Sequence, residues 1–264
     1  MASVPSHVRY GVLCGLMLSS VAHMANAEER VATETVGATP DALPGLLRVG
    51  TPAPGVRNVT LAASAGYGYT EEVLNDNDSH QRLSGRLAAS VRLIPWLTLA
   101  GSLDGRWDMH SSDSGDDSGL VGDPRLRIRA GTEIAPGFSL GAQVSVWLPG
   151  ASAPSIEFDA TTIDGVVMSS YDIGVVTLAA QAGFRWDNSA NAVDDADELS
   201  LNDRLSLGLS DFNSVLTGLG IVGRIDAVEL LAEGSWEPWV GSGAPSLGNA
   251  PLRVAAGARW QPIT

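Results

Sequence analysis

The sequence predicts an all-β protein, an antiparallel transmembrane β-barrel of about ten strands, within a range of about 8–12. Apolar and polar residues alternate with a period of two from residue 58 almost to the end of the chain. Short turns and long polar connections alternate between these segments. All seven tryptophans lie at or near the ends of alternating segments. Amphipathic rings at both strand ends suit the two interfaces of a bilayer, because they settle at the level of the lipid headgroups.

The N-terminal residues 1–27 have the features of a secretory signal peptide. Arg9 supplies the positive charge, residues 10–21 are mostly apolar, and Ala25-Asn26-Ala27 is a small-residue cleavage site. The apolar stretch is too short to cross a bilayer as a helix. Because Cys14 lies within the signal, the cleaved chain has no cysteine and no disulfide.

Residues 28–55 show no sustained periodicity and become rich in proline. We expect them to form a periplasmic lead-in to a β-barrel domain that occupies residues 56–264. The alternative is that this segment folds back into the barrel as a plug, as interior segments do in other barrels.

The first five strands are expected at residues 58–70, 82–93, 97–107, 125–130 and 139–148. The fourth has the sharpest alternation, because Arg125, Arg127 and Arg129 alternate with apolar residues. Residues 135–137, Ala-Pro-Gly, form a turn by composition.

The next five are expected at residues 162–171, 175–187, 213–225, 228–237 and 252–261. The sixth is weak, and the eighth is rich in glycine and ambiguous. Residues 199–211 also alternate, and either extend the eighth strand or add a further one. An even number of strands leaves both termini on the periplasmic side, with the long loops outside.

A soluble β-sandwich or small barrel is the alternative fold, because periodicity alone does not say which face points inward. The aromatic positions favour the membrane. Trp147 is an exception, since it falls in phase with the polar face. The other aromatics near strand ends form two sets: Trp96, Phe138, Tyr171 and Trp260 beside turns, and Tyr67, Tyr69, Trp107, Trp186, Trp236 and Trp239 towards the long loops.

The charge of the chain disfavours nucleic acid as a partner. Its 16 basic residues are all arginine and face 30 acidic ones, for a net charge of −14. Phosphate backbones need a basic surface instead.

The stretch from Val121-Gly122-Asp123-Pro124-Arg125 to Trp147-Leu148-Pro149-Gly150 resembles porin-like outer-membrane β-barrel proteins of Gram-negative bacteria. These often show Gly-Asp before an alternating strand, a Pro-Gly turn and a strand ending near Leu-Pro. The resemblance holds as a pattern from about residue 55 onward. It implies an outer-membrane location and either a structural or binding barrel or a narrow channel for small solutes. Such barrels usually end on an aromatic residue, whereas this chain continues for four residues after Trp260, so either Trp260 acts internally or a longer barrel has been truncated.

Charged residues on the polar face of these strands are the main candidate site. They form either an ion-paired polar core or the lining of a narrow pore whose arginines favour anions, and the sequence does not separate the two. The candidates are Arg86, Arg106, Arg125, Arg127, Arg129, Arg185, Glu229, Glu233, Arg253 and Arg259, with Arg82, Arg92, Asp104 and Glu237 in the same phase.

No enzymatic activity and no cofactor are expected. Gly137-Phe138-Ser139-Leu140-Gly141 has the letters of a nucleophile elbow, but that motif needs a strand before it and a helix after it. His80 and His110 lie in expected outer loops and suggest a surface enzyme only as an alternative. A soluble secreted binding protein is the other alternative.

Outer-membrane lipid is the expected partner, and divalent cations are possible partners of the acidic loops. Clustered carboxylates supply the oxygen ligands that Ca²⁺ prefers, although the spacing is not that of an EF-hand. The clusters are Asp113, Asp116 and Asp117, and Asp194, Asp195, Asp197 and Glu198.

Overall fold

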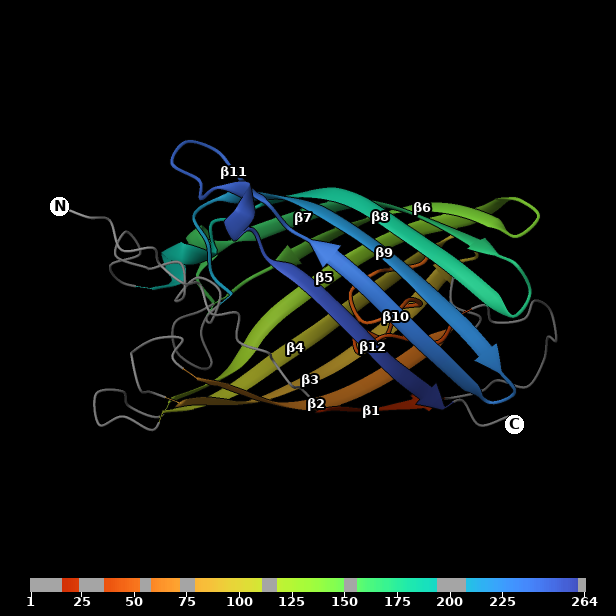
Figure 1. Ribbon diagram of the computed structural model, residues 1–264, viewed down its shortest axis with the longest axis horizontal. Helices are drawn as coiled ribbons and strands as arrows, with labels where there is room; N and C mark the ends of the chain where they lie inside the picture. Colours follow the sequence, from red (N-terminus) through yellow and green to blue (C-terminus); the bar gives the residue numbers. More distant parts are fainter. Residues whose placement is uncertain are drawn as a thin grey trace, which may run out of the picture.

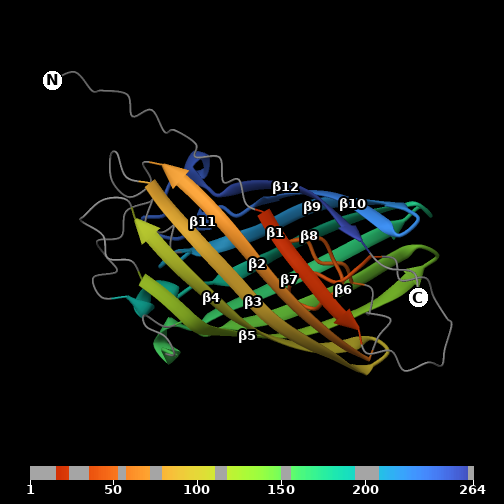
Figure 2. The ribbon, with the colours of Figure 1, turned by 90° about the horizontal axis from the view of Figure 1, so that it is seen from below.

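The protein forms one antiparallel sheet curled around a central space (Figures 1 and 2). This computed structural model describes residues 16–23, 36–52, 58–71, 79–110, 118–149, 156–193 and 208–260. The strands follow one another in chain order around the sheet, as short hairpin connections favour. They are β1 Leu16–His23, β2 Val59–Glu71, β3 Ser79–Ile94, β4 Leu97–His110, β5 Ser118–Ala135, β6 Phe138–Trp147, β7 Thr162–Asp172, β8 Val176–Trp186, β9 Asn213–Ile225, β10 Val228–Trp236, β11 Trp239–Val240 and β12 Leu252–Trp260.

The ten expected strands are confirmed as β2 to β10 and β12. The ambiguous eighth strand has the expected bounds, because Asn213–Ile225 is β9. The fourth is longer than expected, since β5 continues back through Pro124 to Ser118. Proline cannot donate to the ladder, and here it lies at a register shift in the β4–β5 pairing. Residues 199–207 of the further alternating segment lie outside the described residues, and residues 208–211 are not strand.

Two strands were not expected. β1 lies in the predicted signal and pairs with β2, and the two-residue β11 pairs with β9. Among the described residues no ladder joins β12 to β1 or β2, so the sheet is open there. No helix in the described ranges is long and apolar enough to cross a membrane. The short 3-10 helices are η1 Phe158–Ala160, η2 Ser189–Ala192 and η4 Leu247–Asn249.

Tight turns join β3 to β4, β5 to β6, β7 to β8 and β9 to β10. Gly137, in the β5–β6 turn, has a φ of +73°, and a Cβ there would lie 2.7 Å from the carbonyl oxygen of Asp172. Glycine is therefore required at this turn. Ser139 follows it within a strand, so the serine lacks the strand–turn–helix geometry of a nucleophile elbow.

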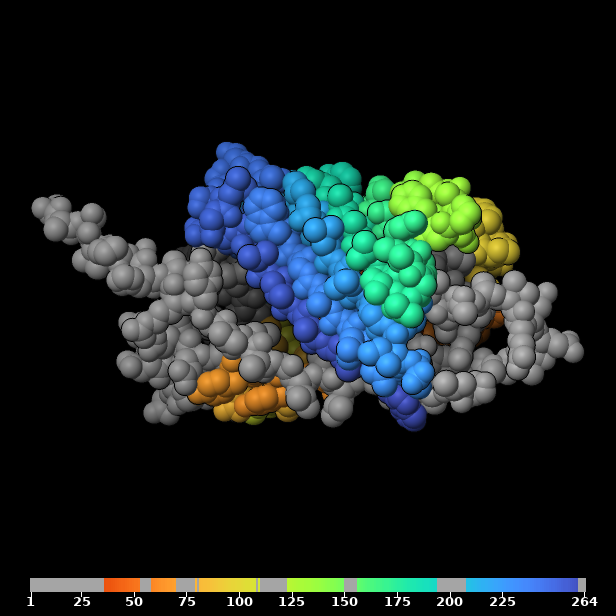
Figure 3. Space-filling view, turned by 45° about the vertical axis from the view of Figure 1, so that its right-hand side comes forward, coloured from red at the N-terminus to blue at the C-terminus, as the bar shows by residue number. Residues whose placement is uncertain are grey.

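The two faces of the sheet separate as the alternation predicts. On the convex, outer face large apolar side chains are exposed: Leu87 is 65% and Leu126 61% exposed. On the concave, inner face charged side chains are buried: Arg127 is 6%, Glu229 4% and Glu233 5% exposed. This order is the reverse of that in a soluble protein. Figure 3 shows the outer face over β9, β10 and β12.

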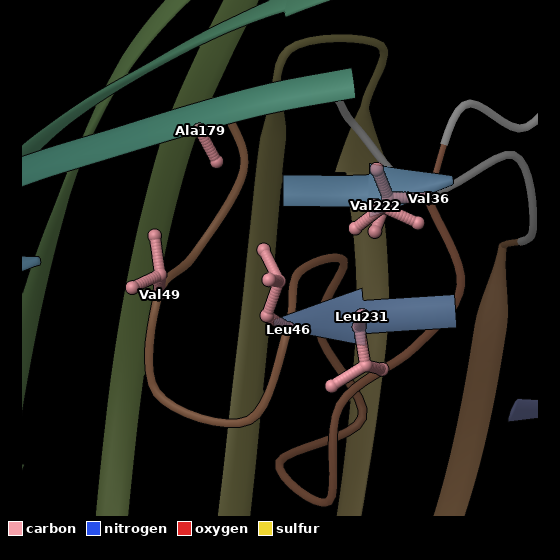
Figure 4. Close-up of a cluster of buried hydrophobic side chains, with 6 residues drawn as sticks. All are labelled: Val36, Leu46, Val49, Ala179, Val222 and Leu231. Carbon is pink, nitrogen blue, oxygen red and sulfur yellow. The ribbon is translucent and has the colours of Figure 1, made fainter. Parts of the chain in front are cut away.

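Residues 36–52, which we call the plug, lie against the inner face of the curled sheet. Val36, Leu46 and Val49 pack there in one buried cluster with Ala179, Val222 and Leu231 of β8, β9 and β10 (Figure 4). The expected lead-in outside the barrel is therefore wrong for residues 36–52, and the fold-back alternative applies to them. The remainder of residues 28–55 lies outside the described residues.

Two strand glycines make room for the plug. A Cβ on Gly131 of β5 would lie 2.0 Å from the carbonyl oxygen of Pro52. A Cβ on Gly220 of β9 would lie 2.6 Å from a methyl group of Leu46. The plug therefore approaches the sheet closely at positions where the strand has no side chain, with its backbone at Gly131 and with the Leu46 side chain at Gly220.

Candidate functional site

All ten candidate residues lie on strands that line the central space, and the structure connects nine of them to one another or to the plug. Arg106 is half-buried on β4, one alternation beyond Asp104, and is also engaged in an interaction. Seven of the other nine belong to three clusters of ion-paired side chains. The remaining two, Glu233 and Arg129, form hydrogen bonds directly with the plug backbone.

The first group, the Asp41 cluster, contains Asp41, Asp104, Arg86, Arg125 and Arg127. Asp41 of the plug lies 2.5 Å from Nη1 of Arg86 and 3.1 Å from Nη2 of Arg127. Arg86 also donates two hydrogen bonds to Asp104, one of them, from Nη2, at 2.7 Å. Nε of Arg125 lies 3.5 Å from the same carboxylate. Asp41 thus links the plug to β3 and β5.

The second group, the Glu229 cluster, contains Glu229, Arg224, Arg259 and Asp172. Glu229 is paired with Arg259 at 2.8 Å and with Arg224 at 3.6 Å, and it accepts the backbone N–H of Gly37 at 3.3 Å. Arg224 also reaches Asp172 at 3.5 Å. Arg259 in turn donates to the plug carbonyls of Ala38 at 2.6 Å and Gly45 at 3.1 Å.

The third group, the Glu237 cluster, contains Glu237, Arg48, Arg185, Arg253 and Asp164. Glu237 follows β10 and lies 3.0 Å from Arg253, 3.5 Å from Arg48 and 3.7 Å from Arg185. Arg185 donates to Asp164 at 2.7 Å. This group joins the plug to β7, β8 and β12.

Glu233 and Arg129 are the two separate anchors, and each binds the plug backbone. The carboxylate of Glu233 accepts the N–H groups of Leu47, Arg48 and Val49 at 2.9–3.1 Å. Consecutive N–H groups around one carboxylate form an anion-binding nest. Arg129 donates to the carbonyls of Pro44 at 2.6 Å and Thr51 at 3.1 Å. Glu233 therefore accepts hydrogen bonds from the N–H groups of the plug, and Arg129 donates hydrogen bonds to its carbonyl groups.

Two acidic groups outside the strands are held ionised by these contacts. Burial opposes ionisation of Asp41, but the guanidinium groups of Arg127 and Arg86 outweigh it and lower its pKa. Burial likewise opposes ionisation of Glu237, and Arg253 and Arg185 lower its pKa. Both carboxylates therefore keep their charge on the inner face.

A separate buried group of polar side chains lies at the long-loop end. Asp187 accepts hydrogen bonds from Thr162 at 2.9 Å and from the backbone N–H of Ser189 at 3.0 Å, and its own N–H donates to Asn213. Burial raises the pKa of Asp187, although these hydrogen bonds act in the opposite direction. The group attaches η2 to the ends of β7 and β9, which is a structural role.

The structure assigns no catalytic or metal site to the histidines and acidic clusters that the sequence analysis considered. His80 and His110 are paired backbone positions in the β3–β4 ladder, at the ends of the two strands. Within the described ranges, no group of three or more His, Cys, Asp or Glu could hold a metal ion. Both acidic clusters of the expected outer loops lie outside those ranges.

Sequence reasoning missed several partners of the candidate charges. Arg224 and Asp164 lie in strands with poor alternation, although both are in phase with inward residues and could have been found from that phase. Asp41 and Arg48 belong to the plug, where no periodic pattern marks them.

The arrangement can hold a chain segment and small anions, because it presents many guanidinium donors on the inner face. No protein-family model matches the chain, and no curated protein matches it. The functional argument therefore rests on the chemistry of its own residues.

Proposed function

We propose that the chain is an integral outer-membrane β-barrel of the porin-like class whose plug closes its interior, so that it acts as a structural or binding barrel in this state. The observation that carries this proposal is the reversal of the two faces. Apolar side chains cover the outer face and charged ones are buried on the inner face.

The energy of the outer face favours lipid over water as its surroundings. Burying a Leu, Val or Ile side chain stabilises a protein by about 1.5–3 kcal/mol, and the net stability of a domain is only about 5–15 kcal/mol. The exposed apolar residues extend from Leu61 on β2 to Val254 on β12. Exposure to water of so continuous an apolar surface is rare in monomeric soluble proteins.

The aromatic positions support the same surroundings. Trp96 and Trp260 are exposed near the turns, and Trp107, Trp186 and Trp236 are exposed near the long loops. Such rings lie at the two headgroup levels of a bilayer. Trp147 and Trp239 are exceptions, because Trp147 lies on the inner face and Trp239 is buried.

Signal cleavage would complete the barrel. Cleavage after Ala27 removes β1 and leaves ten strands in the sheet order, besides the two-residue β11, with β2 and β12 as the free edges. Because a spanning sheet must have no unpaired edge in lipid, we propose that β2 then pairs with β12. An even strand number agrees with the usual architecture of such barrels.

Plug contacts favour a closed interior over an open channel. The plug is bonded to Arg86 on β3, Arg129 on β5, Gln181 on β8, Glu233 on β10 and Arg259 on β12. These strands lie on different sides of the interior, so the plug crosses the path that a solute would take.

Location is tested by membrane fractionation together with a heat-modifiability gel. We expect the protein in the outer-membrane fraction, and a faster band before boiling than after it. A cleaved protein that stays soluble without detergent would contradict the proposal.

A narrow anion channel is the second candidate function, favoured by the arginines of β5. If the plug moves, Arg125, Arg127 and Arg129 would line the opened path and bias it towards anions. In planar bilayers we expect the wild-type chain to conduct little. A chain that conducts steadily, with a bias that shifts when all three arginines become serine, would favour the channel over the closed barrel.

A further inference from the structure

We propose that the inner face carries a binding site for a small soluble oxyanion, a phosphate or carboxylate group, built from Arg125 and Trp147. The two residues are directly opposite each other in the β5–β6 ladder. The guanidinium group of Arg125 lies over the indole ring at 4.3 Å. Stacking of this kind fixes the plane in which the guanidinium presents its donors.

Both residues bury a donor that forms no hydrogen bond within the part of the chain that the structure describes. These donors are Nε of Arg125 and Nε1 of Trp147. Buried donors are almost always hydrogen-bonded in native proteins, so such an atom calls for a partner. Two of them on adjacent, stacked residues point to a single acceptor that both can share.

The local charge calls for a negative acceptor. The strongest charged neighbours of Arg125 are Asp104 and the guanidinium groups of Arg86, Arg127 and Arg185. Asp104 is occupied by two hydrogen bonds from Arg86 and approaches Arg125 only to 3.5 Å. Asp41 pairs with Arg86 and Arg127, and Asp164 pairs with Arg185, whereas Arg125 shares Asp104 with Arg86 at the longer distance, so an added anion would pair with Arg125.

Neighbouring interior charges are already used. On β5, Arg127 is paired with Asp41 and Arg129 binds the plug carbonyls. Across the interior, Arg185 and Arg253 are paired with Asp164 and Glu237. Arg125 lies one alternation nearer the long loops than Arg127, where its stacking partner is Trp147.

The position of the pair selects a soluble ligand over a lipid headgroup. Arg125 and Trp147 alternate with Leu126 and Val146, and Leu126 is 61% exposed on the outer face. The two donors therefore face the interior and not the surface proposed to contact lipid. Trp147 ends β6 and is followed by the long loop, so the site lies at the loop end of the interior.

The test is calorimetric titration of the purified full chain in detergent with inorganic phosphate, and with acetate in a second arm, against sodium chloride of the same ionic strength. We expect one phosphate per chain. Arg125→Gln should weaken binding about tenfold or more, because it removes a charge-assisted hydrogen bond. Trp147→Phe keeps a stacked ring but loses the indole N–H, and should weaken binding about fivefold to tenfold.

Arg92→Gln is the matched control, because it removes an arginine at the turn end of β3 and should bind as the wild type does. The heat-modifiability gel shows whether each variant is folded, and Trp147→Phe keeps the test valid if Arg125→Gln does not fold. Absence of phosphate binding by the wild type, or equal binding by all variants, would overturn the site. Neither result bears on the outer-membrane proposal, which fractionation tests by itself.

Discussion

Removal of the negative charge of Glu233 should release the plug. Glu233 is 5% exposed, and its carboxylate accepts three consecutive backbone N–H groups, those of Leu47, Arg48 and Val49, at 2.9–3.1 Å. In Glu233→Gln one oxygen remains as an acceptor. The amide NH₂ group takes the place of the other oxygen and faces N–H groups that are themselves donors.

The magnitude follows from the loss of charge at these bonds. Oε2 accepts all three N–H groups, so the amide oxygen of glutamine can keep them, but each changes from a bond to a charged group, worth about 1.5–3 kcal/mol, to a neutral bond worth about 0.5–1.5 kcal/mol. We therefore expect the docked plug to lose about 2–5 kcal/mol. At about 1.4 kcal/mol per factor of ten, the undocked population should rise roughly 30-fold to several thousand-fold.

The assay is the rate of thiol labelling at Val49→Cys, since Val49 is fully buried against the sheet. The expected cleaved chain contains no other cysteine, so the label reports only this position. When opening is fast relative to labelling, the rate follows the undocked population. Glu233→Gln should raise it, whereas Asp226→Asn, at an exposed turn, should not.

Equal labelling of the two variants would refute the reasoning, because it would mean that Glu233 does not hold the plug. A change in the heat-modifiability of the whole sheet would instead show that the variant acts on the barrel and not on plug docking.

The remaining predictions concern the plug and the loops. The stabilisation from ionised Asp41 is present above the pKa of the unfolded state and is lost as the pH falls through the lowered pKa of the folded state. The difference in stability between wild type and Asp41→Asn should therefore shrink as the pH is lowered from about 6 to below about 4. Thermal unfolding at each pH measures this difference. Gly131→Ala should destabilise the docked plug by about 1–3 kcal/mol, because its Cβ would meet the Pro52 backbone. Gly223→Ala is the control, since a Cβ there has nothing within 4 Å. Equal rates of thiol labelling at Val49→Cys in the two variants would contradict this prediction. Millimolar Ca²⁺ should raise the unfolding midpoint more than a monovalent salt of equal ionic strength if the acidic loops bind it, and an equal shift would leave them merely solvated.

Strand positions and the sorting of side chains between faces could be predicted because both are local properties. The alternation of Arg125, Arg127 and Arg129 with Leu126 and Ile128 assigns the two faces without knowledge of any partner strand. The same locality explains the correct bounds of β9. The fourth strand was expected to begin at Arg125, whereas β5 continues back through Pro124, because a register shift in the β4–β5 pairing accommodates the proline.

The placement of the candidate charges on one face followed from the sequence, but their pairings did not. Asp104 could have served any of several arginines, and the register of β3, β4 and β5 assigns it to Arg86 and Arg125. Long arginine side chains reach over several residues, so period and phase do not select a partner.

The sequence by itself determined that alternating strands with one apolar and one charged face would form, because a strand's period of two is set by its own backbone. Only the tertiary structure decided that the charged face is concave and that residues 36–52 fill it. The plug has no periodicity of its own, and its N–H groups at residues 47–49 find their acceptor in Glu233, which is 184–186 positions away along the chain. Such contacts depend on the curl of the whole sheet, which no local pattern encodes.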